Sequence, residues 1–165
     1  MKLEKIIKII GKSSGCYHYI TDGRQFIATD LAVYEITGMA TLDKKSITML
    51  TGKDIDYQIQ YTLPAVCEIN QADEEQLYHF KTVHNINGKE VLCTDNDVIM
   101  ADGEYFRPFC DDKQYTYTLA HIGDVKIVIV REGVFFCGAV IARERDYADD
   151  LQKISELLKA NEREG

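Results

Sequence analysis

Short apolar stretches separated by turn residues run through most of this chain, and this pattern indicates a β-rich fold. Between residues 56 and 63, apolar and polar side chains alternate, which is typical of a strand with one buried face. The stretch 125–130 is the most apolar in the chain, so we expect it to be a central strand. The pattern as a whole predicts strands at 17–20, 25–29, 31–37, 56–63, 90–94, 97–101, 115–120, 125–131 and 134–142.

A helix is predicted near the start of the chain. Leu3, Ile6, Ile7 and Ile10 follow the i, i+3, i+4, i+7 spacing of a buried helical face, and the helix is expected to break in the range 11–15. Lysines occupy its other side, at Lys2, Lys5, Lys8 and Lys12.

Three further segments carry helical signals. The range 44–51 fits either a short helix or an edge strand. Asn70 or Asp73, followed by Glu75 and Gln76, resembles a helix start with an acidic first turn. This second helix would bury Leu77, Phe80 and Val83. The range 143–164 predicts a charged amphipathic helix, with Tyr147, Leu151, Ile154, Leu157 and Leu158 facing inward.

One pattern occurs twice, at a constant offset of 65 residues. The segment GRQFIATD at 23–30 is matched by GKEVLCTD at 88–95, and Asp22 corresponds to Asn87. The match continues at Val33-Tyr34 with Val98-Ile99, and at Gly38 with Gly103. Such self-similarity indicates one supersecondary unit used twice. Each copy predicts a β-hairpin, so we expect Gly23 and Gly88 to occupy equivalent turns.

These elements together predict an α+β fold with an antiparallel sheet built from two similar half-units, each with a helix and several strands. The 165 residues suit one domain, expected at 1–143, with half-units at about 1–63 and 64–143. A C-terminal helical extension is expected at 144–165.

Composition and charge narrow the classes of function. The 45% hydrophobic content suffices for a core, and the net charge of −8 excludes a general attraction to nucleic acid or anionic membrane, while leaving room for a local basic face. Lysines interrupt the apolar positions of 1–10, which excludes a signal-peptide core there, and no apolar run is long enough to span a bilayer. The five cysteines, at 16, 67, 93, 110 and 137, stand singly, which favours reduced thiols in the cytoplasm.

The search for catalytic and metal-binding groups points to none, and we expect no cofactor. The histidines, at 18, 79, 84 and 121, have no metal-ligand spacing. Asp95, Asp97, Asp102 and Glu104 crowd one region, but Ile99 occupies the third ligand position of a calcium loop and the sixth lacks glycine. Turn capping accounts for Asp95 and Asp102. The segment Ser13 to Cys16 follows a helix, so it is not the strand–nucleophile–helix turn of a hydrolase.

The lysines at 2, 5, 8 and 12 are the one coherent basic feature. They fit two interpretations. The first is a helix face that is simply exposed to solvent. The second is a surface that contacts DNA phosphates, since such contacts require positive charge but no recognition of individual bases.

The hairpin at 19–30, with its Ala-Thr-Asp corner, resembles that of bacterial and phage DNA-polymerase sliding clamps. The range 125–130 followed by 134–143, with Val140-Ile141-Ala142-Arg143 at its end, is similar to the last strands of a clamp domain. Each clamp domain is a pseudo-twofold pair of half-units, so the resemblance implies one such domain over about 1–143. It also implies one basic, DNA-facing helix from each half.

This chain departs from the clamp pattern in two ways. The second predicted helix carries Asp73, Glu74 and Glu75 and is acidic. Bacterial clamps also have three domains, so a ring would need several copies of this chain. No residue of the clamps' partner-binding pocket can be assigned to a position of this sequence.

Two functions are therefore expected, both non-enzymatic. The first is a clamp-like DNA-replication accessory that binds double-stranded DNA or a protein partner. A clamp-like ring of this chain would be a homo-oligomer. The second is an acidic protein-interaction or regulatory module of the same fold with no DNA contact. A hydrolase using the carboxylates of 95–104 is a third class, which their spacing does not support.

Overall fold

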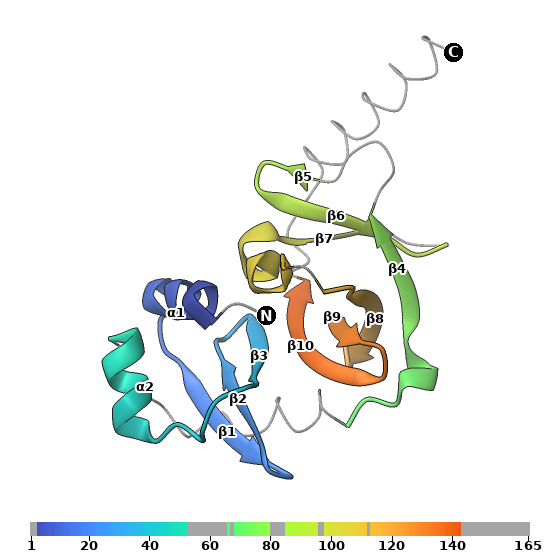
Figure 1. Ribbon diagram of the computed structural model, residues 1–165. Coiled ribbons are helices and arrows are strands. Elements are labelled where there is room, and N and C mark those ends of the chain that lie inside the picture. The colour runs from blue at the N-terminus through green and yellow to red at the C-terminus, as the bar shows by residue number, and fades with distance from the viewer. Residues whose placement is uncertain are drawn as a thin grey trace.

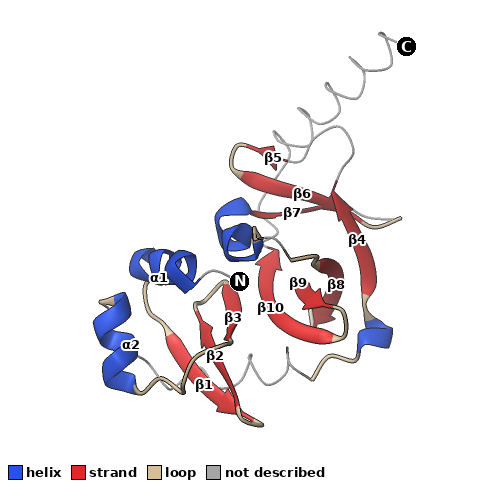
Figure 2. Cartoon of the chain, viewed as in Figure 1, coloured by secondary structure: helices blue, strands red, loops and turns tan. Residues whose placement is uncertain are grey.

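The computed structural model describes residues 3–52, 66, 68–79, 85–95, 98–111 and 113–142. These residues form an α+β fold with ten antiparallel strands, two α-helices and two 3-10 helices (Figures 1 and 2). The helical elements are α1 (Leu3–Lys12), α2 (Lys44–Thr51), η1 (Gln71–Asp73) and η2 (Gly103–Phe109). The strands are β1 (Tyr17–Thr21), β2 (Arg24–Ala28), β3 (Ala32–Ile36), β4 (Glu75–His79), β5 (Asn85–Ile86), β6 (Lys89–Cys93), β7 (Val98–Asp102), β8 (Thr116–Ile122), β9 (Val125–Glu132) and β10 (Phe135–Ala142).

The strands form one sheet in the order β1-β2-β3-β10-β9-β8-β4-β6-β5, and β7 pairs with β6. β4 connects the two parts of the sheet, because its residues Glu75–Leu77 pair with β8 while Tyr78 and His79 pair with β6. As Figure 1 shows, the sheet curls, so that β6 and β7 lie across one end of the β8–β10 strands. The predicted central strand is confirmed, since β9 lies between β8 and β10 and is buried over 127–131.

The two copies of the repeated segment have the same local structure. Asp22 and Gly23 have φ of 50° and 72°, and Asn87 and Gly88 have φ of 50° and 80°. Two successive positive φ values define the type I′ turn that suits a two-residue hairpin, for which Asn-Gly and Asp-Gly are favoured. β2 and β6 start one residue after these turns, in equivalent positions. The sequence prediction for the two glycines is therefore confirmed at the level of the turn.

The copies diverge after these strands. Gly38 has a φ of 78°, whereas Gly103 begins η2, where a Cβ would lie 2.9 Å from the Gly88 carbonyl oxygen. The sequence pattern did not predict η2.

The sheet has an apolar core on each face. α1 packs on one face and buries Ile6, Ile9 and Ile10 among side chains of β2, β3, β9 and β10. The buried face of α1 therefore differs from the predicted one, because Ile9 is buried and Ile7 is only half-buried. α1 also continues through Gly11 to Lys12, beyond the predicted break. The opposite face carries a second cluster that includes Phe26, Ile129 and Phe136.

The segment 44–51, which the sequence pattern predicted as either a short helix or an edge strand, is the helix α2. Asp43 caps its start by accepting a hydrogen bond from the Ser46 N–H at 2.7 Å. Gly52 ends it in the left-handed conformation, with φ of 68°, and its N–H donates to the Thr48 carbonyl. These are the usual N-cap and C-cap residues of a helix.

The helix predicted after Asn70 or Asp73 is wrong. Asn70 does act as a cap, but it caps η1, a single 3-10 turn, and the chain then enters strand β4. Only Leu77 of β4 is buried. Pairing with β8 and β6 supplies backbone hydrogen bonds on both sides, and this tertiary context overrides the local helical signal.

Several sequence predictions fall outside the described residues. They are the strand at 56–63, the C-terminal helix at 144–165, the side chains of Phe80 and Val83, and the positions of Lys2, Cys67, His84 and Asp97.

Candidate functional site

Two of the four lysines proposed to contact DNA hold η2 against α1. The Lys5 ammonium donates to the carbonyl oxygens of Arg107, at 2.9 Å, and Cys110, at 3.1 Å. A cation is favourable there because the last carbonyls of a helical turn carry partial negative charge. At the other end of η2, Lys12 forms an ion pair with Glu104. The basic face of α1 therefore has a structural role in joining α1 to η2.

Part of this lysine face remains accessible to a ligand. Lys8 is exposed, and the Lys12 side chain keeps 65% of its surface exposed in spite of its ion pair. An exposed ion pair contributes little stability, so a phosphate can compete for the lysine. Lys5 is less available because of its two carbonyl contacts, and Lys2 is outside the described residues.

The carboxylates of 95–104 are not gathered into one site. Glu104 is paired with Lys12, and Asp102 lies 3.9 Å from the Lys89 ammonium. Asp97 is outside the described part of the chain. Among the described residues, no group of histidine, cysteine, aspartate and glutamate side chains is arranged to hold a metal ion.

The described histidines lie in separate places. His18, in β1, is buried, its Nε2 has no hydrogen-bond partner among the described residues, and burial lowers the pKa of its ring. His79 lies 3.6 Å from a Glu90 carboxylate oxygen and packs edge-on against Tyr117. His121 is exposed. The structure therefore does not bring these residues together.

The four described cysteines, at 16, 93, 110 and 137, are free thiols. Burial raises the pKa of the Cys16 and Cys137 thiols, which disfavours the reactive thiolate. The Ser13 hydroxyl donates to the carbonyls of Ile10 and Gly15, each at 2.7 Å, so it closes the end of α1. The segment before β1 is thus a structural connection.

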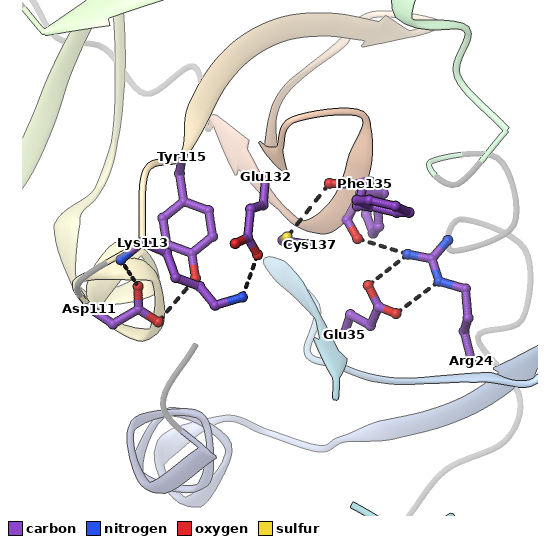
Figure 3. Close-up of polar contacts among 9 residues, drawn as sticks. Arg24, Glu35, Asp111, Lys113, Tyr115, Glu132, Phe135 and Cys137 are labelled. Atoms are coloured by element: carbon purple, nitrogen blue, oxygen red, sulfur yellow. Dashed lines mark hydrogen bonds and ion pairs between the residues drawn. The ribbon is translucent and has the colours of Figure 1, made fainter. Parts of the chain in front are cut away.

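A partly buried ion pair that the sequence pattern did not reveal joins neighbouring strands of the sheet (Figure 3). The Arg24 guanidinium donates to both carboxylate oxygens of Glu35, at 2.8 and 2.7 Å, and to the Phe136 carbonyl at 2.8 Å. It also lies over the Phe26 ring. These contacts connect β2, β3 and β10, and such a bidentate pair is geometrically specific.

A second polar network lies beside it (Figure 3). Lys113 is paired with Glu132 of β9, and the Tyr115 hydroxyl donates to the Asp111 carboxylate at 3.1 Å. Burial, with the Asp111 hydrogen bond, raises the pKa of Tyr115. These bonds fix the approach of the chain to β8.

The most distinctive concave feature is an apolar pocket of about 190 Å³ on the sheet face opposite α1. Its floor comes from β2, β3, β9 and β10, and the β2–β3 turn with Asp30 forms part of its rim. Two small side chains on this face, Ala28 and Ala139, leave the space open, and Ala32, whose side chain packs in the core on the α1 face, also borders it. The remaining lining residues are Tyr17, Thr29, Val33, Val66, Ile127 and Ile141.

Sequence reasoning did not find this pocket, because its residues come from five separate segments. Alanines at the end of β2, at the start of β3 and within β10 were the available signal, yet a small side chain is equally common in a packed core. Tertiary structure alone shows which alanines border a space.

Comparison with family models, curated proteins and solved structures found no match to this chain. No helix within the described residues is long and apolar enough to cross a membrane.

Proposed function

We propose that this chain is a non-enzymatic binding domain, and that an apolar side chain of a protein partner enters the pocket on the sheet face opposite α1. The observation that carries this proposal is the pocket itself. It combines an apolar lining with a rim of polar groups from the Thr29–Asp30 turn, which is the usual composition of a binding site.

The size of the pocket indicates what it receives. A dry apolar cavity of roughly 150 Å³ can take up benzene. A pocket of about 190 Å³ is therefore large enough for one aromatic side chain. Burial of a Phe-sized side chain stabilises a complex by about 1.5–3 kcal/mol, and such aromatic anchors dominate many protein interfaces.

The charged groups that are most buried support a binding role over a catalytic one. Glu35 is held by Arg24, and Glu74 is held by Arg131 and Thr118. The first pair connects the neighbouring strands β2 and β3, and the second connects the start of β4 to β8 and β9, so these charges stabilise the framework that carries the pocket.

A second candidate function is weak, sequence-independent binding of duplex DNA by α1, as in a DNA-replication accessory. The exposure of Lys8 and of most of the Lys12 side chain favours it. The loss of the second predicted helix weighs against it, since strand β4 occupies that place.

We further propose that the chain has the clamp-like arrangement of two related half-units, about 1–63 and 64–143. The matching type I′ turns and the matching positions of β2 and β6 support this proposal. Thr29 and Thr94, which follow these strands in the two copies, are both buried. The half-units would differ in one element: η1 and β4 of the second half-unit would stand where the first has α1.

A selection of random peptides on the full chain tests the pocket proposal. We expect peptides with an aromatic residue to be enriched, and to bind at least about tenfold more weakly to Ala28→Leu, which fills the pocket. Ala72→Leu adds the same side chain at an exposed position of η1 and should bind normally. Failure to enrich any peptide, or equal binding to a folded Ala28→Leu variant, would reject the proposal.

A further inference from the structure

The turn between β9 and β10 presents two large apolar side chains to solvent. Val134 and Phe135 are each 71% exposed. Glu132 pairs with Phe135, so the turn has two residues, and Gly133, with φ of 61°, occupies its first position. Such turns usually carry polar residues. An apolar pair at the tip of a well-paired hairpin is thus suited to enter a hydrophobic site.

The apolar pocket lies at the other end of the same hairpin. Ile127 and Ile141, which face each other near the start of β9 and the end of β10, both line it. Phe135 is six residues from Ile141 along β10, or about 20 Å at the rise of a strand. Since one paired strand carries both features, Phe135 cannot reach the pocket of its own molecule.

We propose that the pocket receives Phe135 from a second copy of this chain, so that copies associate head to tail. This inference rests on the proposed function of the pocket and names its occupant. The pocket volume suits one aromatic ring, and Phe135 is an aromatic side chain that the described fold leaves exposed. Val134 would cover the mouth of the pocket.

The charges next to the two surfaces are complementary. Lys113 is paired with Glu132 at the base of the tip, and its side chain remains 47% exposed. Asp30 is exposed at the rim of the pocket. A docked tip therefore brings a lysine toward an acidic rim, which favours one orientation of the two copies.

Tip and pocket are different surfaces, so each copy can use both at once. Such a heterologous contact produces a closed ring if the rotation between copies closes, and an open chain of copies if it does not. The second copy completes the pocket by supplying Phe135.

Sedimentation velocity of the full chain over a wide range of concentrations tests this inference. We expect concentration-dependent association that Phe135→Ser weakens about 30-fold, the effect of losing an anchor side chain. Met49→Ser, at a 77% exposed position of α2, is the matched control and should associate normally. Because Phe135 is exposed, its replacement should leave the fold intact, which circular dichroism can verify.

Mixing two variants identifies the geometry. Phe135→Ser retains the pocket, and Ala28→Leu retains the tip, so each alone should be monomeric. A head-to-tail contact predicts that their mixture forms a dimer through the one intact pair of surfaces, and no larger species. Monomers at all concentrations, or association that Phe135→Ser does not weaken, would overturn the inference. If the monomeric chain still binds pocket-dependent peptides, the proposed function stands without self-association.

Discussion

Glu74 and Arg131 form an ion pair that is almost completely removed from solvent. The Glu74 side chain has 0% exposure, and that of Arg131 has 8%. Arg131 Nε donates to a Glu74 carboxylate oxygen at 3.2 Å, a second guanidinium nitrogen contacts the other oxygen, and the Thr118 hydroxyl donates to the carboxylate. The contacts fasten the start of β4 to β8 and β9. They therefore hold the two parts of the curled sheet together.

Removal of this carboxylate should destabilise the protein strongly. Glu74→Ala leaves the buried Arg131 charge without its partner, and we expect the free energy of unfolding to fall by about 3–5 kcal/mol. Urea denaturation followed by circular dichroism measures it. Glu104→Ala, which breaks the exposed pair with Lys12, should cost no more than about 1 kcal/mol. Equal costs for the two variants would contradict the burial argument.

The stability of the protein should fall on mild acidification because of His18. Burial lowers the pKa of His18 below its unfolded value of about 6.5, so the unfolded chain binds the proton more readily below that pH. The free energy of unfolding should then decrease as the pH falls from about 7 toward the folded pKa, by at most about 1.4 kcal/mol per pH unit.

Denaturation at a series of pH values, with variants, assigns this effect. His18→Gln should flatten the pH dependence between 7 and the onset of carboxylate protonation, whereas His121→Gln, at an exposed position, should not. An unchanged pH profile in His18→Gln would show that His18 is not the group responsible.

The two repeated turns should respond alike to substitution. Ala at Gly23 or Gly88 must adopt a positive φ, so each variant should lose about 1–2 kcal/mol of stability. Gly15→Ala is the control. Gly15 does not have a left-handed φ, and an added Cβ would make only an ordinary contact, 3.8 Å from the Tyr17 hydroxyl oxygen. Thermal denaturation provides the comparison. A neutral effect at either turn would mean that the two copies are not energetically equivalent.

DNA binding by α1, if it occurs, should be sensitive to salt. Lysine–phosphate contacts release counterions, so affinity for duplex DNA should drop steeply as the salt concentration rises. Replacement of Lys2, Lys5, Lys8 and Lys12 by Glu should abolish it, and Lys8→Glu alone should weaken it without disturbing η2. Fluorescence anisotropy at low salt measures both. An absence of binding near 50 mM salt, where phosphate contacts are favoured, would reject the DNA candidate.

Self-association should show the opposite salt response. Two copies with a net charge of −8 repel each other, and added salt screens that repulsion while leaving apolar docking intact. Sedimentation at low and high salt should therefore show equal or stronger association at high salt. Dissociation by salt would indicate that charges, and not Phe135, hold the copies together.

Local signals were sufficient for much of the sheet. Gly23, Gly88 and Gly133 mark turns whose backbone conformation demands glycine. Of the strands beside them, β1, β2, β6, β9 and β10 were predicted to within one residue, whereas the short strand β5 was not predicted. The same reasoning failed at 70–79, where an acidic helix start was expected and β4 was found. Propensity describes a segment by itself, and β4 is decided by the strands on either side of it.

The residues of the candidate sites also fall into those that local sequence predicts and those that only the tertiary structure identifies. The sequence alone determined that α1 carries a row of lysines, because helical spacing places side chains on a face without reference to the rest of the chain. Only the tertiary structure decided that Lys5 and Lys12 contact η2, that Arg131 is buried with Glu74, and that three alanines border a pocket. Each of these contacts joins residues far apart in the chain, and the pairing of strands that brings them together is a property of the whole sheet.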